Sequence, residues 1–148
     1  MYYTAKYAHL QEPSHLKIGD TVRYGDLLGI IGSTGQSKGR HLHLDCVEGQ
    51  HPFIWTLANM EHGIVTPAYK QLNYFVDEYL LDAPFIITAY FNDYRYQKLL
   101  GKAHLAYDII GVTVSAWNVY WNRTKPGTIT GNRFHGGYGN TLLVEFEA

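Results

Sequence analysis

The chain has 148 residues, a formal net charge of −1, 46% hydrophobic and 17% charged residues. This composition favours one folded domain with a hydrophobic core, and it argues against extended disorder and against nucleic acid or an anionic membrane surface as the main partner. A single cysteine excludes an internal disulfide and a cysteine-rich zinc knuckle, and no apolar run of about 18 residues is present to span a membrane.

Most of the chain has the residue pattern of β-strands. The first six residues lack the apolar core of a signal peptide. Short apolar runs broken by glycine predict strands within residues 22–31, whereas residues 109–119 and 141–147 are rich in β-forming side chains. Residues 53–84 differ, because apolar side chains within 69–80 recur at helical spacing. We therefore expect a mainly β, antiparallel fold with a partly helical connection.

His41 and His43 form the most informative pattern in the chain. Strand residues two apart point to the same face, about 7 Å from each other. One histidine could then bind a metal while the other reaches a water held at the metal's open position. The alternative is two polar side chains on the solvated face of a strand. Strand alternation sends Cys46 to the opposite face, which predicts a buried apolar role for it.

His104 and Asp108 are a second candidate pair, four residues apart. A straight strand would separate them by about 13 Å, too far to bind one ion. A helix would bring them to about 6 Å, but the sequence that follows is strongly β-forming. A shared metal therefore requires a sharp bend around Ala106 and Tyr107. The alternative is an unrelated surface histidine and aspartate.

Together these patterns resemble the lysostaphin/LytM-type zinc metallopeptidases, which cleave peptide bonds in bacterial peptidoglycan. The segments that carry the resemblance are Tyr7-Ala8-His9-Leu10, Lys17-Ile-Gly-Asp-Thr-Val22, Gly29-Ile-Ile-Gly-Ser-Thr-Gly35, His41-Leu42-His43, His104-Leu-Ala-Tyr-Asp108 and Gly136-Gly-Tyr-Gly-Asn-Thr141. The resemblance covers residues 1–50 and 86–148. It implies the antiparallel β core of that family, of the duplicated hybrid-motif type.

The order of the segments is reversed relative to the family. In the family the segment with histidine and aspartate comes first, whereas here it lies in the C-terminal half. We therefore predict a circular permutation within a single peptidase domain, residues 1–148. Residues 86–148 form the family's N-terminal half, residues 1–50 its C-terminal half, and residues 51–85 the connection between the old ends. Residues 140–147 would then pair with residues 2–7 like a hairpin, in a monomer or, as a rival, in a strand-swapped dimer.

The resemblance also implies roles for five side chains. His43, His104 and Asp108 would hold Zn²⁺, and His9 and His41 would be the catalytic histidines. Three protein ligands and an open position are typical of a catalytic zinc. The chain has no His-Glu-x-x-His motif, so two histidines would replace the glutamate base of other zinc proteases.

The implied function is a zinc-dependent endopeptidase acting on peptidoglycan peptides. It would act at the bacterial cell wall, outside the cell or on a virion, as in a phage lytic protein. One alternative is a degenerate, non-catalytic domain of the same type that binds peptidoglycan or a protein partner. A biotinyl or lipoyl carrier domain is another alternative, but the chain lacks the tripeptide with the modified lysine that such a domain needs.

Several further residues have weaker interpretations. Ala106 stands where the family has glycine, so a positive φ there would be strained by about 1 kcal/mol. Replacing it by glycine is therefore expected to keep or improve zinc affinity. The glycine-rich residues 32–39 are expected to form a flexible rim of the site. Four histidines without a motif partner are expected to be solvated or structural: His15, His51, His62 and His135. Of these, His135 could belong to the wall of a substrate groove.

Overall fold

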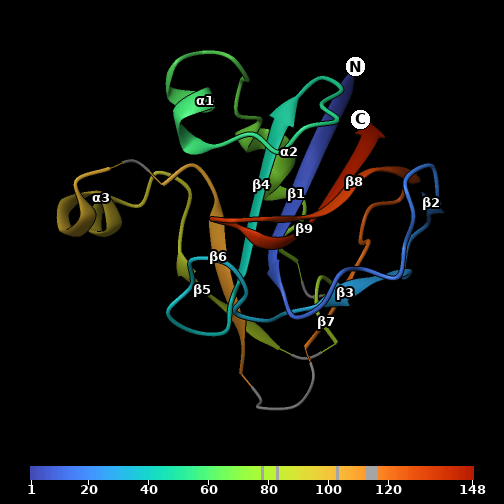
Figure 1. The fold of residues 1–148 in the computed structure, drawn as a ribbon, viewed down its shortest axis with the longest axis horizontal. Helices are drawn as coiled ribbons and strands as arrows, with labels where there is room; N and C mark the ends of the chain where they lie inside the picture. Colours follow the sequence, from blue (N-terminus) through green and yellow to red (C-terminus); the bar gives the residue numbers. More distant parts are fainter. Residues whose placement is uncertain (78, 83, 103, 113–116) are drawn as a thin grey trace.

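The computed structural model describes residues 1–77, 79–82, 84–102, 104–112 and 117–148 (Figure 1). In this part of the chain the strands are β1 (Tyr2–Leu10), β2 (Thr21–Val22), β3 (Leu27–Ile30), β4 (Leu42–Glu48), β5 (Phe85–Ala89), β6 (Tyr107–Gly111), β7 (Asn118–Tyr120), β8 (Gly127–His135) and β9 (Gly139–Glu147). The helices are α1 (Leu57–Glu61), α2 (Tyr69–Asn73) and α3 (Tyr94–Leu100). No helix of these described ranges is long and apolar enough to cross a membrane.

One large antiparallel sheet dominates the fold. Its strand order is β2-β8-β9-β1-β4-β6-β5, and β3 and β7 form a separate antiparallel pair. The prediction of a mainly β, antiparallel fold with a partly helical connection is therefore confirmed.

The connection after β4 covers both faces of the large sheet. On one face, Phe75 packs edge-on against Tyr7 and Trp121 in the main core. On the other face, Trp55 and Met60 pack in a smaller cluster with side chains of β4 and β9. Alternate residues of β1 and β4 therefore face either the main core or the smaller cluster, and the candidate site lies on the second face.

The two ends of the chain are neighbours in the centre of the large sheet. β1 pairs with β9 from Tyr2 opposite Glu147 to Tyr7 opposite Leu142, so the predicted pairing of these segments is confirmed within one chain. The Ala148 amide donates to the Met1 carbonyl at 3.2 Å. Figure 1 shows both termini at the same end of these adjacent strands. The ends therefore lie where a hairpin turn would join two such strands.

Predicted helical and strand boundaries differ from the structure in three places. The helix expected within residues 69–80 is α2 alone, which ends at Asn73; beyond it the chain turns and buries Phe75. The short strands expected within residues 22–31 are β2, which begins at Thr21, and β3, which runs through Gly29 instead of ending there. Within residues 109–119, β6 ends at Gly111 and β7 begins at Asn118, whereas 113–116 lie outside the described residues.

Helix α3 is not predicted from the sequence. A helix is recognised by apolar residues that recur on its buried face, and α3 buries few of them: Leu99 is 83% exposed and Leu100 58%. Its ends nevertheless carry ordinary caps. The Asp93 side chain accepts hydrogen bonds from the first turn, and Gly101 closes the helix in the left-handed region at φ 70°.

The glycine-rich loop is docked on the turn between β8 and β9 by a contact that leaves no room for a Cβ atom. Gly139 has φ +68°, and a Cβ there would collide with the backbone and hydroxyl of Thr34. Thr34 in turn accepts from the Asn140 amide at 3.0 Å. Gly136, in the same turn, has open space around it.

We expect Gly139→Ala to lower the free energy of unfolding by at least about 2 kcal/mol, because it combines a strained φ with a backbone collision. Gly136→Ala is the matched control and should change it by less than about 0.5 kcal/mol. Urea unfolding followed by circular dichroism measures both values. Equal stability of the two variants would contradict the docking of this loop.

Candidate metal centre and active site

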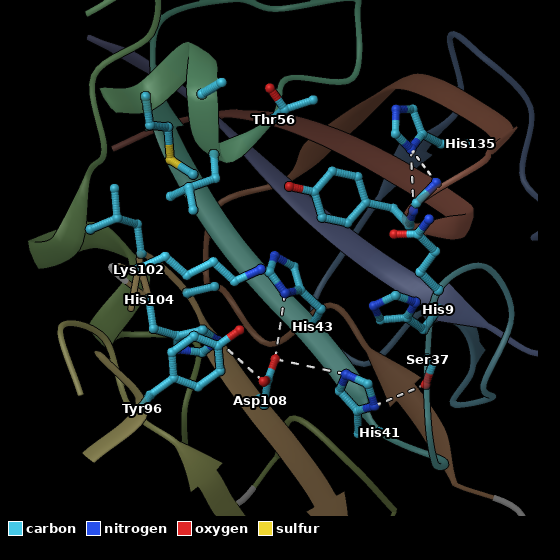
Figure 2. A pocket seen from close by; sticks show the side chains of 18 of the residues that line it. His9, Ser37, His41, His43, Thr56, Tyr96, Lys102, His104, Asp108 and His135 are labelled. Carbon is cyan, nitrogen blue, oxygen red and sulfur yellow. Dashed lines mark hydrogen bonds and ion pairs between the residues drawn. The ribbon is translucent and has the colours of Figure 1, made fainter. Parts of the chain in front are cut away.

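The register of β4 and β6 places His43 directly opposite Asp108. His43 Nδ1 lies 3.4 Å from Asp108 Oδ1, and His104 Nε2 lies 3.1 Å from Asp108 Oδ2. One ligand atom from each of the three residues lies within 4.8 Å of the other two. Figure 2 shows Asp108 between His41, His43 and His104. The three predicted metal ligands are therefore brought together.

His104 reaches Asp108 because it lies outside the strand. The chain bends at Ala106, and β6 begins at the next residue, Tyr107. The bend predicted at this point is confirmed. Among the described residues other than glycine, positive φ occurs at His9 and Asn92, so Ala106 is not in the left-handed region. The alanine is therefore not strained by its backbone conformation.

His9 enters the site through a bulge in β1. Two residues, Ala8 and His9, stand between the pairs that Tyr7 and Leu10 make with β9, where β9 has one residue. Strict alternation would send His9 to the core side with Tyr7. Instead, at φ 62°, its ring lies 4.8 Å from that of His41, between ring centroids. Bulges re-aim side chains in this way beside active sites, and the strained φ is held by the surrounding structure.

His41 lies immediately before β4, next to the three candidate ligands. Its Nε2 is 3.9 Å from Asp108 Oδ1, and its Nδ1 is 2.8 Å from the Gly39 carbonyl oxygen. Ser37 Oγ lies 3.3 Å from the same Nδ1. The glycine-rich loop therefore orients this ring.

Every one of the four histidines has one ring nitrogen occupied by a neighbouring acceptor. Carbonyl oxygens of Thr34, Gly39 and Tyr90 lie at 2.7, 2.8 and 3.0 Å from Nδ1 of His9, His41 and His104 respectively, and Asp45 Oδ2 lies 3.0 Å from Nε2 of His43. Because carbonyl and carboxylate oxygens accept hydrogen bonds, these nitrogens carry the hydrogen. The other nitrogen of each ring keeps its lone pair for a metal or a proton.

The donor set fits a zinc ion. Asp108 Oδ1 is buried and accepts no hydrogen bond among the described residues, as expected of an atom meant for another partner. Two imidazoles and one carboxylate are common ligands of catalytic zinc, and an outer acceptor on each histidine is typical of such sites. His43, His104 and Asp108 can therefore hold a metal ion.

Burial and the contacts among charged groups set the electrostatics of the cluster together. Burial is the main cause that lowers the pKa of His9 to about 4. Burial opposes ionisation of Asp108, but the adjacent imidazoles of His104 and His43 outweigh it and lower the pKa of its carboxyl. Burial would lower the pKa of His43, yet the adjacent carboxyl groups of Asp108 and Asp45 raise it. The carboxyl is therefore ionised and His9 neutral near pH 7.

A buried ionic group lies directly behind His43. Asp45 and Lys6 are both fully buried, and Lys6 Nζ lies 3.2 Å from Asp45 Oδ2. The Trp55 indole Nε1 donates to Asp45 Oδ1 at 3.1 Å. No role is predicted for these residues from the sequence; the position of Asp45, two residues after His43 on the same face, is the one available indication.

The candidate residues line a pocket of about 520 Å³. Its walls come from the glycine-rich loop, α1, the α3 region and the β8–β9 turn (Figure 2). The lining residues not proposed from the sequence as site residues include Thr56, Leu57, Met60, Tyr96 and Lys102. The predicted rim lies beside the site, because the pocket is lined by Gln36, Ser37 and Lys38 of the glycine-rich loop. His135, considered above as part of a groove wall, also lines the pocket.

The remaining polar candidates lie elsewhere. His15, His51 and His62 do not line this pocket, and His51 Nε2 lies 2.9 Å from the Glu48 carbonyl oxygen. Cys46 is 2% exposed and belongs to the main core, which confirms its predicted burial.

Comparison with known proteins gives a family match for the N-terminal third of the chain. Residues 2–53 match the model of Peptidase family M23. The match covers about a third of the chain and includes His9, His41 and His43, but it does not extend to His104 or Asp108. No solved structure matches the chain. The M23 match supports the predicted resemblance to LytM-type peptidases, in a chain whose β-rich fold and metal-ligand cluster agree with it.

Ala106 provides a test of the bend between His104 and Asp108. Because its φ is not positive and it is 1% exposed, Ala106→Gly relieves no strain and removes a buried methyl group. We expect a loss of about 1 kcal/mol in the free energy of unfolding, with zinc affinity unchanged. Urea unfolding and a competitive zinc titration measure the two quantities. A clear gain in affinity would show that the bend is strained by the alanine.

Proposed function

We propose that this chain is a zinc-dependent endopeptidase that hydrolyses peptide bonds in bacterial peptidoglycan. The observation that carries the proposal is the convergence, in one open pocket, of His9, His41 and His43 from the M23-matched segment with His104 and Asp108 from the other end of the chain. A structural role alone does not require four histidines whose free nitrogens share one pocket.

His43, His104 and Asp108 would hold the zinc. When bound, zinc lowers the pKa of a coordinated water towards about 7 and polarises a carbonyl group. His9 and His41, which are not in the ligand set, would orient the attacking water and transfer its proton to the leaving amine through their free ring nitrogens. Their carbonyl partners, Thr34 and Gly39, keep each ring in the tautomer that can accept this proton.

The pocket suits a peptide. It is open at the surface and bounded by the glycine-rich loop on one side and by α1 and the α3 region on others. The M23 match supports peptidoglycan as the source of that peptide. With this substrate the enzyme would act at the bacterial cell wall, either outside the cell or on a virion.

We also propose that the domain is a circular permutation of the LytM-type core. Two observations support this proposal. The two termini are neighbours in the paired strands β1 and β9, and residues 104–108 lie beside His43 because β6 pairs with β4. In this proposal residues 51–85 connect the ends of the unpermuted domain. The pairing of β1 with β9 inside one chain agrees with a monomer.

The proposed roles separate in a set of histidine variants. We expect His43→Ala to lose both bound zinc and peptidase activity. His41→Ala should retain about one zinc per chain yet lose at least about 100-fold in rate, because general acid–base assistance is removed. Metal analysis and a peptide-cleavage assay measure the two effects, with exposed His62→Ala as control. Parallel loss of zinc in both variants would contradict the assignment of His41.

The substrate proposal is tested by digesting purified peptidoglycans that differ in cross-bridge. We expect new amino termini in the stem peptide or the cross-bridge, identified by mass spectrometry, and none after zinc removal by a chelator. Release of sugar fragments without new amino termini would contradict an endopeptidase. Zinc binding with no cleavage of any peptidoglycan would instead favour the non-catalytic, binding domain.

A further inference from the structure

Lys6 is a fully buried lysine on the site face of β1. Its ammonium donates to the Trp55 carbonyl oxygen at 2.7 Å and lies 3.2 Å from Asp45 Oδ2. The ring of Tyr138 covers it, with the ring centroid 3.7 Å from Nζ. Lysine is almost never fully buried unless it is paired, because the charged form loses its hydration. This position is therefore costly unless the ammonium has a specific partner.

That partner is the carboxylate that holds His43. Asp45 Oδ2 lies 3.0 Å from His43 Nε2 as well as 3.2 Å from Lys6 Nζ, and Trp55 Nε1 donates to Oδ1. An ionised carboxylate only accepts hydrogen bonds, so His43 Nε2 must donate to it. Nδ1, on the Asp108 side of the ring, is then the nitrogen available to a metal.

We propose that Lys6 is a positioning residue for the metal centre. Together with Trp55, it holds Asp45 in place, and Asp45 in turn fixes the ring of His43. The inference rests on the proposed metal site, but not on the substrate or on hydrolysis. Trp55 lies outside the M23-matched segment, so the connection after β4 contributes to the support of a ligand on β4.

The fold gives this group little freedom to rearrange. Lys6 and Asp45 are directly opposite in the β1–β4 register. Trp55 contacts both of them, through its carbonyl oxygen and its indole N–H. Removal of the ammonium would leave a buried carboxylate without a counter-charge and a buried carbonyl without its donor. The carboxylate would then be free to change its hydrogen bonds, and the ring of His43 with it.

Lys6→Met tests the role, because methionine keeps the length of the side chain and removes the ammonium. Thr4→Val is the matched control. Thr4 is fully buried two residues earlier on the same strand and face, and its hydroxyl donates to the Gly49 carbonyl oxygen at 2.8 Å, away from Asp45. Both changes remove a buried polar contact of β1, but Lys6→Met alone removes one that leads to His43.

Two measurements report on the metal centre without using activity: zinc affinity by competition with a chromophoric chelator, and the visible absorption of the Co²⁺-substituted protein. We expect Lys6→Met to weaken zinc binding about tenfold or more and to alter the Co²⁺ spectrum. Thr4→Val should keep the affinity and spectrum of the parent, even where its melting temperature falls as far. Parent-like affinity and spectrum in Lys6→Met, or equal losses in Thr4→Val, would overturn the proposal.

Trp55→Phe keeps the test open if Lys6→Met fails to fold. It removes the N–H donated to Asp45 and leaves the backbone carbonyl that binds Lys6. We expect a smaller loss of zinc affinity in the same direction; unchanged affinity and Co²⁺ spectrum would overturn the role of this group. A parent protein that binds zinc but cleaves no peptide would contradict the proposed hydrolysis alone, whereas one that binds no zinc would contradict both.

Discussion

The antiparallel pairing of β4 with β1 on one side and with β6 on the other is the constraint on which the site depends. It sets His43 opposite Asp108 and beside Ala8, so three strands that are far apart in the sequence meet at one residue. A shift of β4 by one residue would turn His43 towards the main core, because side chains alternate between the faces of a sheet. Burial of Leu42, Leu44 and Cys46 on the core face opposes that shift.

Two departures from regular strand geometry bring the remaining histidines, His9 and His104, to the site that this register forms. The bulge at His9 turns a ring that alternation would bury onto the site face, and the bend at Ala106 returns His104 towards Asp108. In both places the backbone is held by hydrogen bonds outside the strand. The His9 amide donates to the Tyr138 carbonyl oxygen, and the His104 carbonyl oxygen accepts from the Asn92 amide. Irregular backbone therefore positions functional side chains in both places, and at His9 it does so with a strained, positive φ.

These features explain which parts of the site could be predicted from the sequence. Strand alternation raises the possibility that His41 and His43 share a face, but their proposed roles rest on the resemblance to LytM-type peptidases. The bend before Asp108 follows from the distance that two ligands of one ion can span. The bulge at His9 could not be found, since nothing in Tyr7-Ala8-His9 marks where alternation fails. Lys6 and Trp55 were also missed, because a buried lysine and a tryptophan become partners of Asp45 only once the strand register and the path of the connection are known.

The connection after β4 has a part in the site that its length alone does not suggest. Its first segment covers the site face with Trp55 and α1, and its later segment buries Phe75 in the core on the opposite face. A connection that only joined two ends of a domain would need neither contact. Because Trp55 binds both Lys6 and Asp45, a displacement of this segment would change the hydrogen bonds that hold the ring of His43. In the proposed permutation, the segment that joins the old ends also contacts, through Trp55, the group proposed to position His43.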